Sequence, residues 1–210
     1  MIQQFLNMHL IIISGPSGSG KTTLSEIILK NINDGLILST DNYYRTGLIS
    51  KLLSKILTSY FDRKISINVQ LFKRDLEFIL KNGYSNFSYK YNFKTKSIKK
   101  IYKNTKNIRY VIIEGIFGQE ISKSFSKKNV ILIKLKANKQ TCMERVVKRD
   151  FIERGKSKYL AKKNFIKGWE LFNKNKNKNK NNSRNYLKKI IIKKKNEIKP
   201  LLKKITNIVN

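Results

Sequence analysis

The segment Gly-Pro-Ser-Gly-Ser-Gly-Lys-Thr at residues 15–22 constrains the fold of this chain more than any other feature. A run of four aliphatic residues, 10–13, precedes it and is typical of a buried parallel strand. Apolar residues after it recur at helical spacing, at Leu24, Ile27 and Ile28. Strand, glycine-rich turn and helix in this order predict a phosphate-binding loop in an α/β sheet. A glycine turn that binds nothing is the less favoured alternative.

The loop predicts a binding site for a nucleoside triphosphate. Its glycines let the backbone approach an anion closely, and the N–H groups of the loop and of the helix start point at that anion. Lys21 then reaches the β- and γ-phosphates, and the hydroxyl of Thr22 joins the shell of a Mg²⁺ ion. The residues expected to bind the triphosphate are Gly15, Ser17, Gly18, Ser19, Gly20, Lys21, Thr22 and Thr23.

The formal net charge of +33 raises the question of nucleic-acid binding. The charge is uneven, because residues 1–50 hold three basic and three acidic side chains whereas residues 151–210 hold 19 and 3. The excess is mostly lysine and accompanies asparagine and isoleucine, as drift in an AT-rich coding sequence would produce. Arginine, which suits bidentate phosphate contacts, is scarcer. We therefore favour drift over a selected polyanion-binding face, and expect nucleic-acid contact to be incidental.

The composition favours a cytoplasmic protein. A chain of 210 residues fits one α/β domain, or one domain with an appendage. It has no run of eighteen apolar residues, so no membrane span is expected. Its first residues lack the basic and apolar regions of a secretory signal. Cys142, the single cysteine, cannot form an internal disulfide, which agrees with a reducing compartment.

Apolar strands alternate with helices, which predicts a parallel sheet covered by helices on both faces. Strands are expected at 10–14, 35–39, 110–114, 129–135 and 187–192. Helices are expected at 21–32, about 46–60, about 68–82, near 118–127, at 138–150, and finally through Leu201 and Ile208. The aromatic-spotted stretch at 83–106 is expected to be a hairpin or a long loop.

A single domain with a late insertion is expected. Residues 1–172 form its core. From 173 to 182 the sequence alternates asparagine with lysine, so its charges repel one another and predict a mobile loop over 173–186. Residues 187–210 then supply the last strand and helix of the same domain.

Two carboxylates follow predicted strands on the side of the phosphate loop. Asp41 comes just after the strand at 35–39, and Glu114 ends the strand at 110–114. Ligands of such sheets bind beyond the carboxyl ends of the strands. Asp41 is therefore placed to accept a proton from a hydroxyl, and both carboxylates to share Mg²⁺ with Thr22. In isolation, Asp41 would more often cap the segment that follows it.

A basic cluster follows the predicted strand at 129–135. Its members are Arg145, Lys148, Arg149, Arg154 and Lys156. Positions 145 and 149 share one helix face. Folded over a triphosphate, these side chains would form a lid that neutralises charge developing during phosphoryl transfer. A solvated helix face with weak ion pairs is the alternative.

Six segments together resemble the uridine kinases (uridine–cytidine kinases). They are 15–23, 40–45, 60–62, 91–97, 112–117 and 148–156. Many kinases share the phosphate loop, whereas Thr-Asp-Asn-Tyr-Tyr-Arg combined with Arg-Asp-Phe-Ile-Glu-Arg-Gly is more specific. The resemblance implies a P-loop kinase fold with an acceptor region at about 83–106 and a lid at about 148–165. It also implies a homo-oligomer, since this family often forms tetramers.

Members of that family use ATP or GTP with Mg²⁺ to phosphorylate the 5′-hydroxyl of a pyrimidine ribonucleoside. The resemblance implies Asp41 as the base, with Lys21 and Arg149 also catalytic and Arg154 over the phosphates. The implied metal-site residues are Thr22, Asp41 and Glu114. The implied substrate-binding residues are Asp41, Tyr44, Asp62, Tyr91, Phe93, Lys96, Lys156 and Asn164. Among these, Asp62 would bind the ribose hydroxyls and the aromatic residues would wall the base.

Four positions depart from the family pattern. Lys96 stands where the family has a histidine that reads the base edge. Lysine donates hydrogen bonds but cannot accept them, so recognition of a carbonyl survives more readily than recognition of an amino group, and cytidine is in doubt. Asn92 replaces an aspartate, Lys156 a lid arginine and Asn164 a glutamine.

The leading hypothesis from the sequence is a cytoplasmic uridine kinase of pyrimidine salvage. The altered base site keeps open a related P-loop kinase for another riboside, a sugar phosphate or pantothenate. In a different class of function, an RNA-associated NTPase or binding protein would use the basic tail, and its RNA binding would depend steeply on salt.

Overall fold

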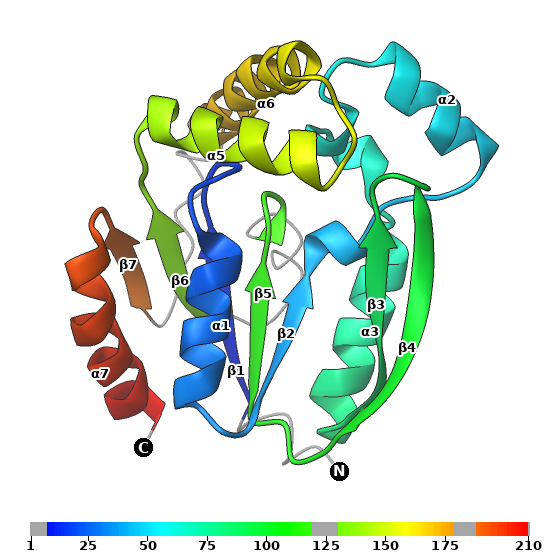
Figure 1. Cartoon of the computed structure of the whole chain (residues 1–210). Helices are drawn as coiled ribbons and strands as arrows, with labels where there is room; N and C mark the ends of the chain where they lie inside the picture. Colours follow the sequence, from blue (N-terminus) through cyan, green and yellow to red (C-terminus); the bar gives the residue numbers. More distant parts are fainter. Residues whose placement is uncertain (1–7, 119–129, 179–187, 210) are drawn as a thin grey trace.

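The computed structural model describes residues 8–118, 130–178 and 188–209. At its centre lies a five-stranded sheet in the order β2-β5-β1-β6-β7, in which every neighbouring pair is parallel (Figure 1). The strands are β1 (His9–Ser14), β2 (Gly35–Ser39), β5 (Tyr110–Glu114), β6 (Val130–Leu135) and β7 (Lys188–Ile192). The predicted strands and the α/β class are confirmed, each strand boundary to within one residue.

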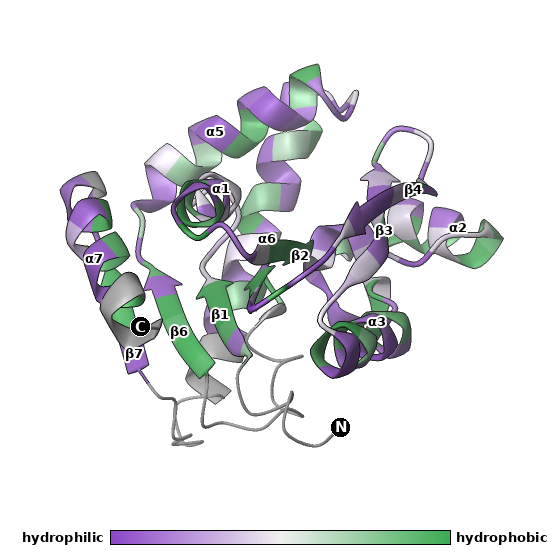
Figure 2. Ribbon diagram, turned by 90° about the horizontal axis from the view of Figure 1, so that it is seen from below, coloured by the Kyte–Doolittle hydropathy of each residue, from purple (hydrophilic) through white to green (hydrophobic). Residues whose placement is uncertain are grey.

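Helices cover both faces of the sheet because side chains along each strand alternate between the two faces. Ile12 points into a core shared with α3 (Val69–Asn82). Ile11 points into a second core, shared with α1 (Lys21–Asn31) and α7 (Ile198–Val209). Figure 2 shows β1 and β6 as almost continuously hydrophobic, as strands buried on both faces should be.

An antiparallel hairpin lies beside α3, at one edge of the molecule (Figure 1). It consists of β3 (Ser85–Asn92) and β4 (Ser97–Thr105), which confirms the hairpin expected within 83–106. Helix α5 (Lys139–Ile152) follows β6 as predicted. Within the described ranges, no helix combines the length and apolar content needed to cross a membrane.

The helix predicted at 46–60 is shorter than expected. Helix α2 (Leu48–Ile56) ends early, and Ser59 adopts a left-handed conformation with φ of 58°. Two short 3₁₀ turns, Tyr60–Asp62 and Lys64–Ser66, follow it. The helix ends where Leu57 adopts an extended conformation, and the left-handed Ser59 then starts the turn that carries Asp62.

Helix α6 (Lys158–Lys178) was not predicted from the sequence. Its buried Phe165 packs against Cys142 and Val146 of α5, so tertiary contact supports a helix whose own apolar stripe is narrow. The helix includes residues 173–178, so the prediction of a loop over this first part of the Asn/Lys run is wrong. The rest of that loop, and the helix predicted near 118–127 beyond residue 118, lie outside the described residues.

Ile12→Ala should test the core. Ile12 is fully buried in the central strand, so the cavity left by its side chain should lower the free energy of unfolding by about 2–5 kcal/mol. Urea unfolding followed by circular dichroism measures this change. Ile191→Ala, at a side chain 44% exposed on β7, is the control and should cost far less. If the two variants lost the same free energy of unfolding, the result would contradict the burial of Ile12 and the exposure of Ile191.

Candidate functional site

The phosphate loop connects β1 to α1 at the carboxyl end of the sheet (Figure 1). Gly18 and Gly20 have positive φ, 80° and 89°, in the region that favours glycine. The Nζ of Lys21 donates a hydrogen bond of 2.9 Å to the carbonyl oxygen of Pro16 across the loop. Burial lowers the pKa of Lys21, while the charges of Glu114 and Asp41 oppose that shift. The loop therefore holds a buried amine beside two carboxylates.

The three residues predicted to hold a metal come together next to this loop. The hydroxyl of Thr22 donates to a carboxylate oxygen of Glu114 at 3.4 Å. Burial raises the pKa of Glu114, and the negative charge of Asp41 raises it further. Asp41 lies in the 3₁₀ turn that directly follows β2. A hydroxyl and two mutually repelling carboxylates form a set of hard oxygen ligands that fits Mg²⁺.

A cleft of about 650 Å³ runs along the phosphate loop. Of the residues predicted to bind ATP, Ser17, Gly18, Ser19, Gly20, Lys21, Thr22, Thr23 and Arg149 line it. Gly15 and Arg154 do not line it: Gly15 packs against Ser19 and Leu135, and Arg154 lines a second, smaller cavity instead. The opposite wall includes Arg145, which was expected in the lid, together with residues that sequence analysis missed: Lys136, Ala137, Asn138, Thr141, Ile192, Lys193, Lys194 and Ile198. Most of these residues come directly after β6 and β7. The rule that ligands bind beyond the carboxyl ends of parallel strands could therefore have identified them from the sequence.

A second cavity, of about 80 Å³, lies between the α2–α3 segment and the lid formed by α5 and α6. The predicted residues that line it are Asp41, Tyr44, Asp62, Arg149, Arg154, Lys156 and Asn164. Sequence analysis missed Ser59, Tyr60, Phe61, Asp150, Phe165, Gly168 and Trp169. Ligand pockets usually measure about 300 Å³ or more, so this cavity is smaller than the usual ligand pocket.

Of the three aromatic residues predicted to wall the base, one lines the cavity and two lie behind it. Tyr44 lines the cavity, whereas Tyr91 and Phe93 are absent from its lining. They pack against the Tyr44 ring instead, with centroid distances of 5.3 and 5.7 Å. On the opposite side, Trp169 of α6 faces the cavity. Tyr91 and Phe93 thus support side chains that line the cavity rather than lining it themselves.

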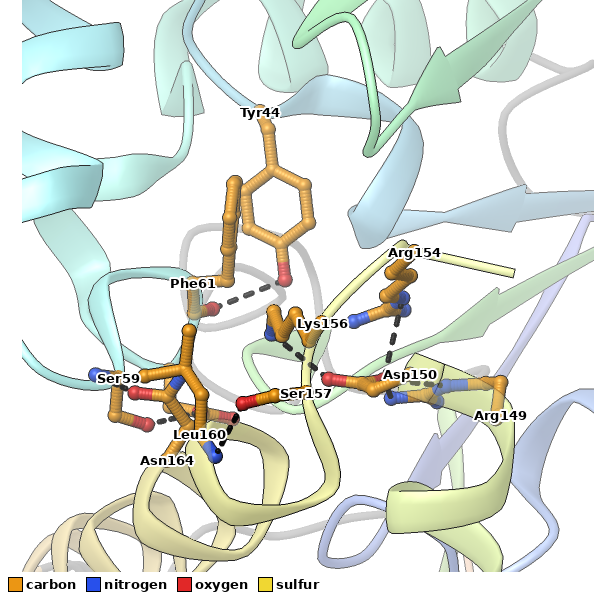
Figure 3. Close-up of polar contacts among 11 residues, drawn as sticks. Tyr44, Ser59, Phe61, Arg149, Asp150, Arg154, Lys156, Ser157, Leu160 and Asn164 are labelled. Atoms are coloured by element: carbon orange, nitrogen blue, oxygen red, sulfur yellow. Dashed lines mark hydrogen bonds and ion pairs between the residues drawn. The ribbon is translucent and has the colours of Figure 1, made fainter. Parts of the chain in front are cut away.

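The hydroxyl of Tyr44 has two hydrogen-bond partners, Asp41 and the backbone of Phe61, and Figure 3 shows the contact with Phe61. It is 3.1 Å from Oδ1 of Asp41 and 2.9 Å from the carbonyl oxygen of Phe61, the residue before Asp62. Burial raises the pKa of Tyr44, and the charges of Asp41 and Asp62 raise it further, so the hydroxyl keeps its proton. Since a phenol has one hydrogen to donate, it can bond to only one of these oxygens at a time.

Helix α6 covers the carboxylate of Asp62. The hydroxyl of Ser59 donates to Asp62, and the Ser59 N–H donates to Oδ1 of Asn164 at 3.0 Å. A Cβ at Gly168 would lie 2.5 Å from Oδ2 of Asp62, so only glycine lets α6 approach this closely. Burial raises the pKa of Asp62, although the hydrogen bond from Ser59 opposes the shift.

Asp150 holds the cations of the lid together (Figure 3). Its carboxylate is 2.7 Å from Nη2 of Arg149, 3.4 Å from Nε of Arg154 and 2.8 Å from Nζ of Lys156. Burial disfavours the charged carboxylate, but Arg154, Arg149 and Lys156 outweigh it and hold the pKa of Asp150 below its ordinary value. The guanidinium of Arg154 also lies over the ring of Phe93, 3.4 Å from its centroid. The lid is therefore an ionic cluster around one buried carboxylate.

The comparisons with known proteins agree with this geometry. A model described as the phosphoribulokinase/uridine kinase family matches residues 10–170. The chain belongs to this family. It is 30% identical over 155 residues to a uridine kinase of Staphylococcus haemolyticus, covering 72% of each chain. The predicted resemblance is confirmed, and the protein is an ATP-dependent kinase.

Solved structures confirm the P-loop kinase fold. A possible uridine kinase from Bacillus stearothermophilus matches with a TM-score of 0.56 and 16% identity, covering 89% of each chain. A putative fructose transport system kinase from Silicibacter sp. matches with a TM-score of 0.59 and 16% identity, covering 79% of this chain and 84% of that one. At this identity the likeness concerns the fold alone.

Asp150→Asn should destabilise the protein in a pH-dependent way. Because the pKa of Asp150 is lowered in the folded state, its contribution is present above the ordinary value of 3.8 and is lost as the pH falls through the folded value. Breaking this buried pair should cost about 3–5 kcal/mol at pH 7. Denaturant unfolding of both proteins between pH 7 and pH 3 measures the difference, which should shrink toward pH 3.

Asp34→Asn is the control, since the Asp34 carboxylate is 46% exposed and lies 4.0 Å from Arg109. It should change stability little at any pH. If the free energy of unfolding lost in Asp150→Asn stayed the same from pH 7 to pH 3, the result would contradict an ionic role for the cluster.

Proposed function

We propose that the protein transfers the γ-phosphate of ATP or GTP to the 5′-hydroxyl of a pyrimidine ribonucleoside, with uridine as the reference acceptor. One observation carries the proposal: the nucleotide cleft and the smaller cavity meet, since Asp41 and Arg149 line both. Phosphoryl transfer requires donor and acceptor to face each other across such a junction. The uridine kinases of Staphylococcus haemolyticus and Macrococcus caseolyticus among its relatives support the acceptor class.

In this proposal Asp41 is the general base. The 5′-hydroxyl donates to the Asp41 carboxylate and attacks the γ-phosphorus, while the bond to the bridging oxygen breaks and ADP leaves. Tyr44 donates its hydrogen to Asp41 in the resting enzyme and turns to the Phe61 carbonyl as the acceptor hydroxyl takes its place. The proton leaves the acceptor on Asp41.

The remaining groups bind and neutralise charge. Lys21 exchanges the carbonyl of Pro16 for the phosphates, and Arg149 reaches them from the lid. Mg²⁺, held by Thr22, Asp41 and Glu114, would supply a further positive charge at the transferring group. Asp62 accepts hydrogen bonds from the ribose hydroxyls, which a buried carboxylate does strongly.

A second candidate is a P-loop kinase acting on another small hydroxyl substrate. The observation that favours it is the position of Lys96, which donates to Ser54 of α2 and is not among the residues lining the cavity. The base-recognition group of the family pattern is thus changed in type and turned toward another element. An acceptor panel of ribosides, sugar phosphates and pantothenate separates the two candidates.

Asp41→Asn should nearly abolish transfer without preventing ATP binding. Loss of a general base typically lowers the rate roughly 100- to 10,000-fold. Radiolabelled phosphate transfer to uridine measures turnover, and calorimetry with an ATP analogue measures binding. Asp34→Asn, a loss of one exposed carboxylate, should leave both unchanged. An Asp41→Asn enzyme with ordinary turnover would rule out Asp41 as the base.

A further inference from the structure

Three lysines gather at the rim of the acceptor cavity. Helix α2 carries Lys51 and Lys55 on either side of Ser54, and Lys96 reaches Ser54 from the turn of the β3–β4 hairpin. Figure 1 shows that turn next to α2. We name Lys51, Lys55 and Lys96 the rim lysines. Ser54 itself lines the acceptor cavity but not the nucleotide cleft, so the rim lies away from the phosphate donor.

The hydrogen bonding fixes the Lys96 ammonium at this rim. The hydroxyl of Ser54 donates to the backbone carbonyl oxygen of Lys51 at 2.8 Å, which turns its lone pairs toward Lys96. The Nζ of Lys96 then donates to Ser54 at 2.7 Å. Since an ammonium has three hydrogens, Lys96 can keep this bond and still donate to a ligand. Lys96 itself has a left-handed backbone, with φ of 54°.

The surroundings do not neutralise these charges. Residues 42–61, which include α2, and residues 78–113, which include the hairpin, contain no aspartate or glutamate. The cavity wall has three carboxylates, on Asp41, Asp62 and Asp150, and three cations, on Arg149, Arg154 and Lys156, so it is formally neutral. The rim lysines therefore add three positive charges that the wall does not compensate.

The lysines repel one another in this arrangement. Burial lowers the pKa of Lys96, and the charges of Lys55, Lys51 and Lys156 lower it further. A negative ligand between them would relieve this repulsion, whereas neutral uracil would leave it in place. The unpaired positive charge thus distinguishes anionic from neutral acceptors.

We propose that the rim lysines bind a carboxylate on the base of the riboside acceptor. The inference rests on the proposed function, because it takes the small cavity as the acceptor site with the 5′-hydroxyl at Asp41. Ser54 lines the cavity but not the nucleotide cleft, so the rim lysines beside it face the part of a riboside away from its reacting hydroxyl. A pyrimidine riboside with a carboxylate is then preferred to uridine itself.

The experiment compares 5-carboxyuridine with its neutral carboxamide, which has nearly the same shape. Calorimetry of the full chain with Mg²⁺ and a non-hydrolysable ATP analogue should show the acid binding about tenfold or more tightly than the amide, as expected for hydrogen bonds to a charged group. Lys96→Met should remove this preference. Lys99→Met, which deletes one exposed lysine from β4 of the same hairpin, should retain it.

Several results would overturn the proposal. Equal affinity for acid and amide would do so, as would an equal effect of Lys96→Met and Lys99→Met, which would indicate the general positive field of the chain. Ribose 5-phosphate is a third ligand, and tighter binding of it than of the acid, lost in Lys96→Met, would assign the rim lysines to a phosphate instead.

Phosphoryl transfer measured in parallel separates this inference from the proposed function. If the enzyme phosphorylates uridine but binds 5-carboxyuridine no better than its carboxamide, the role proposed for the rim lysines is wrong and the proposed kinase activity still stands. Absence of transfer to every riboside would overturn the proposed function, while the binding data would still decide whether the rim lysines select an anion.

Discussion

Strand β1 pairs in parallel with β5 on one side and β6 on the other, from Leu10 to Ile13, and this central position determines where the functional groups lie. Parallel strands end at the same edge of the sheet, so the phosphate loop after β1 meets Glu114 at the end of β5. Strand β2 pairs with the other side of β5 and brings Asp41 to the same edge. The lid follows β6. One pairing pattern thus brings together segments far apart in the sequence.

Because the site depends on the pairing of parallel strands, the parts of the fold and site that follow from those strands could be predicted from the sequence. Strands β1, β5 and β6 are aliphatic runs that are largely buried on both faces. Lys21 ends the loop after β1, Asp41 follows β2 and Glu114 ends β5, so sequence and topology rules suffice for these residues. Helix α6 has a narrow apolar stripe among lysines and asparagines, and becomes a helix through its contact with α5. Ser59, Asn164 and Gly168 meet only after folding, because their contacts join segments about a hundred residues apart.

The electrostatics of the site contrast with those of the whole chain. Only 13 of its residues are acidic, against 46 basic ones, yet Asp41, Asp62, Glu114 and Asp150 all lie at the site. The wall of the smaller cavity is therefore formally neutral, whereas the nucleotide cleft is lined by six cations and two carboxylates. Such a field draws anionic nucleotides toward the cleft, while the local carboxylates hold the cations in fixed geometry. Composition drift and a working site are compatible, because most of the excess charge lies outside the site walls.

The contact between Gly168 and Asp62 links acceptor affinity to the conformational equilibrium of the lid. If an acceptor enters only when α6 has lifted, the measured dissociation constant equals the intrinsic one divided by the fraction of molecules that are open. Anything that weakens the contact, such as a loss of the Ser59–Asn164 hydrogen bond, would then raise apparent affinity without touching the ligand. Affinity for the acceptor would thus be adjustable through the packing of α6 on the turn that carries Asp62.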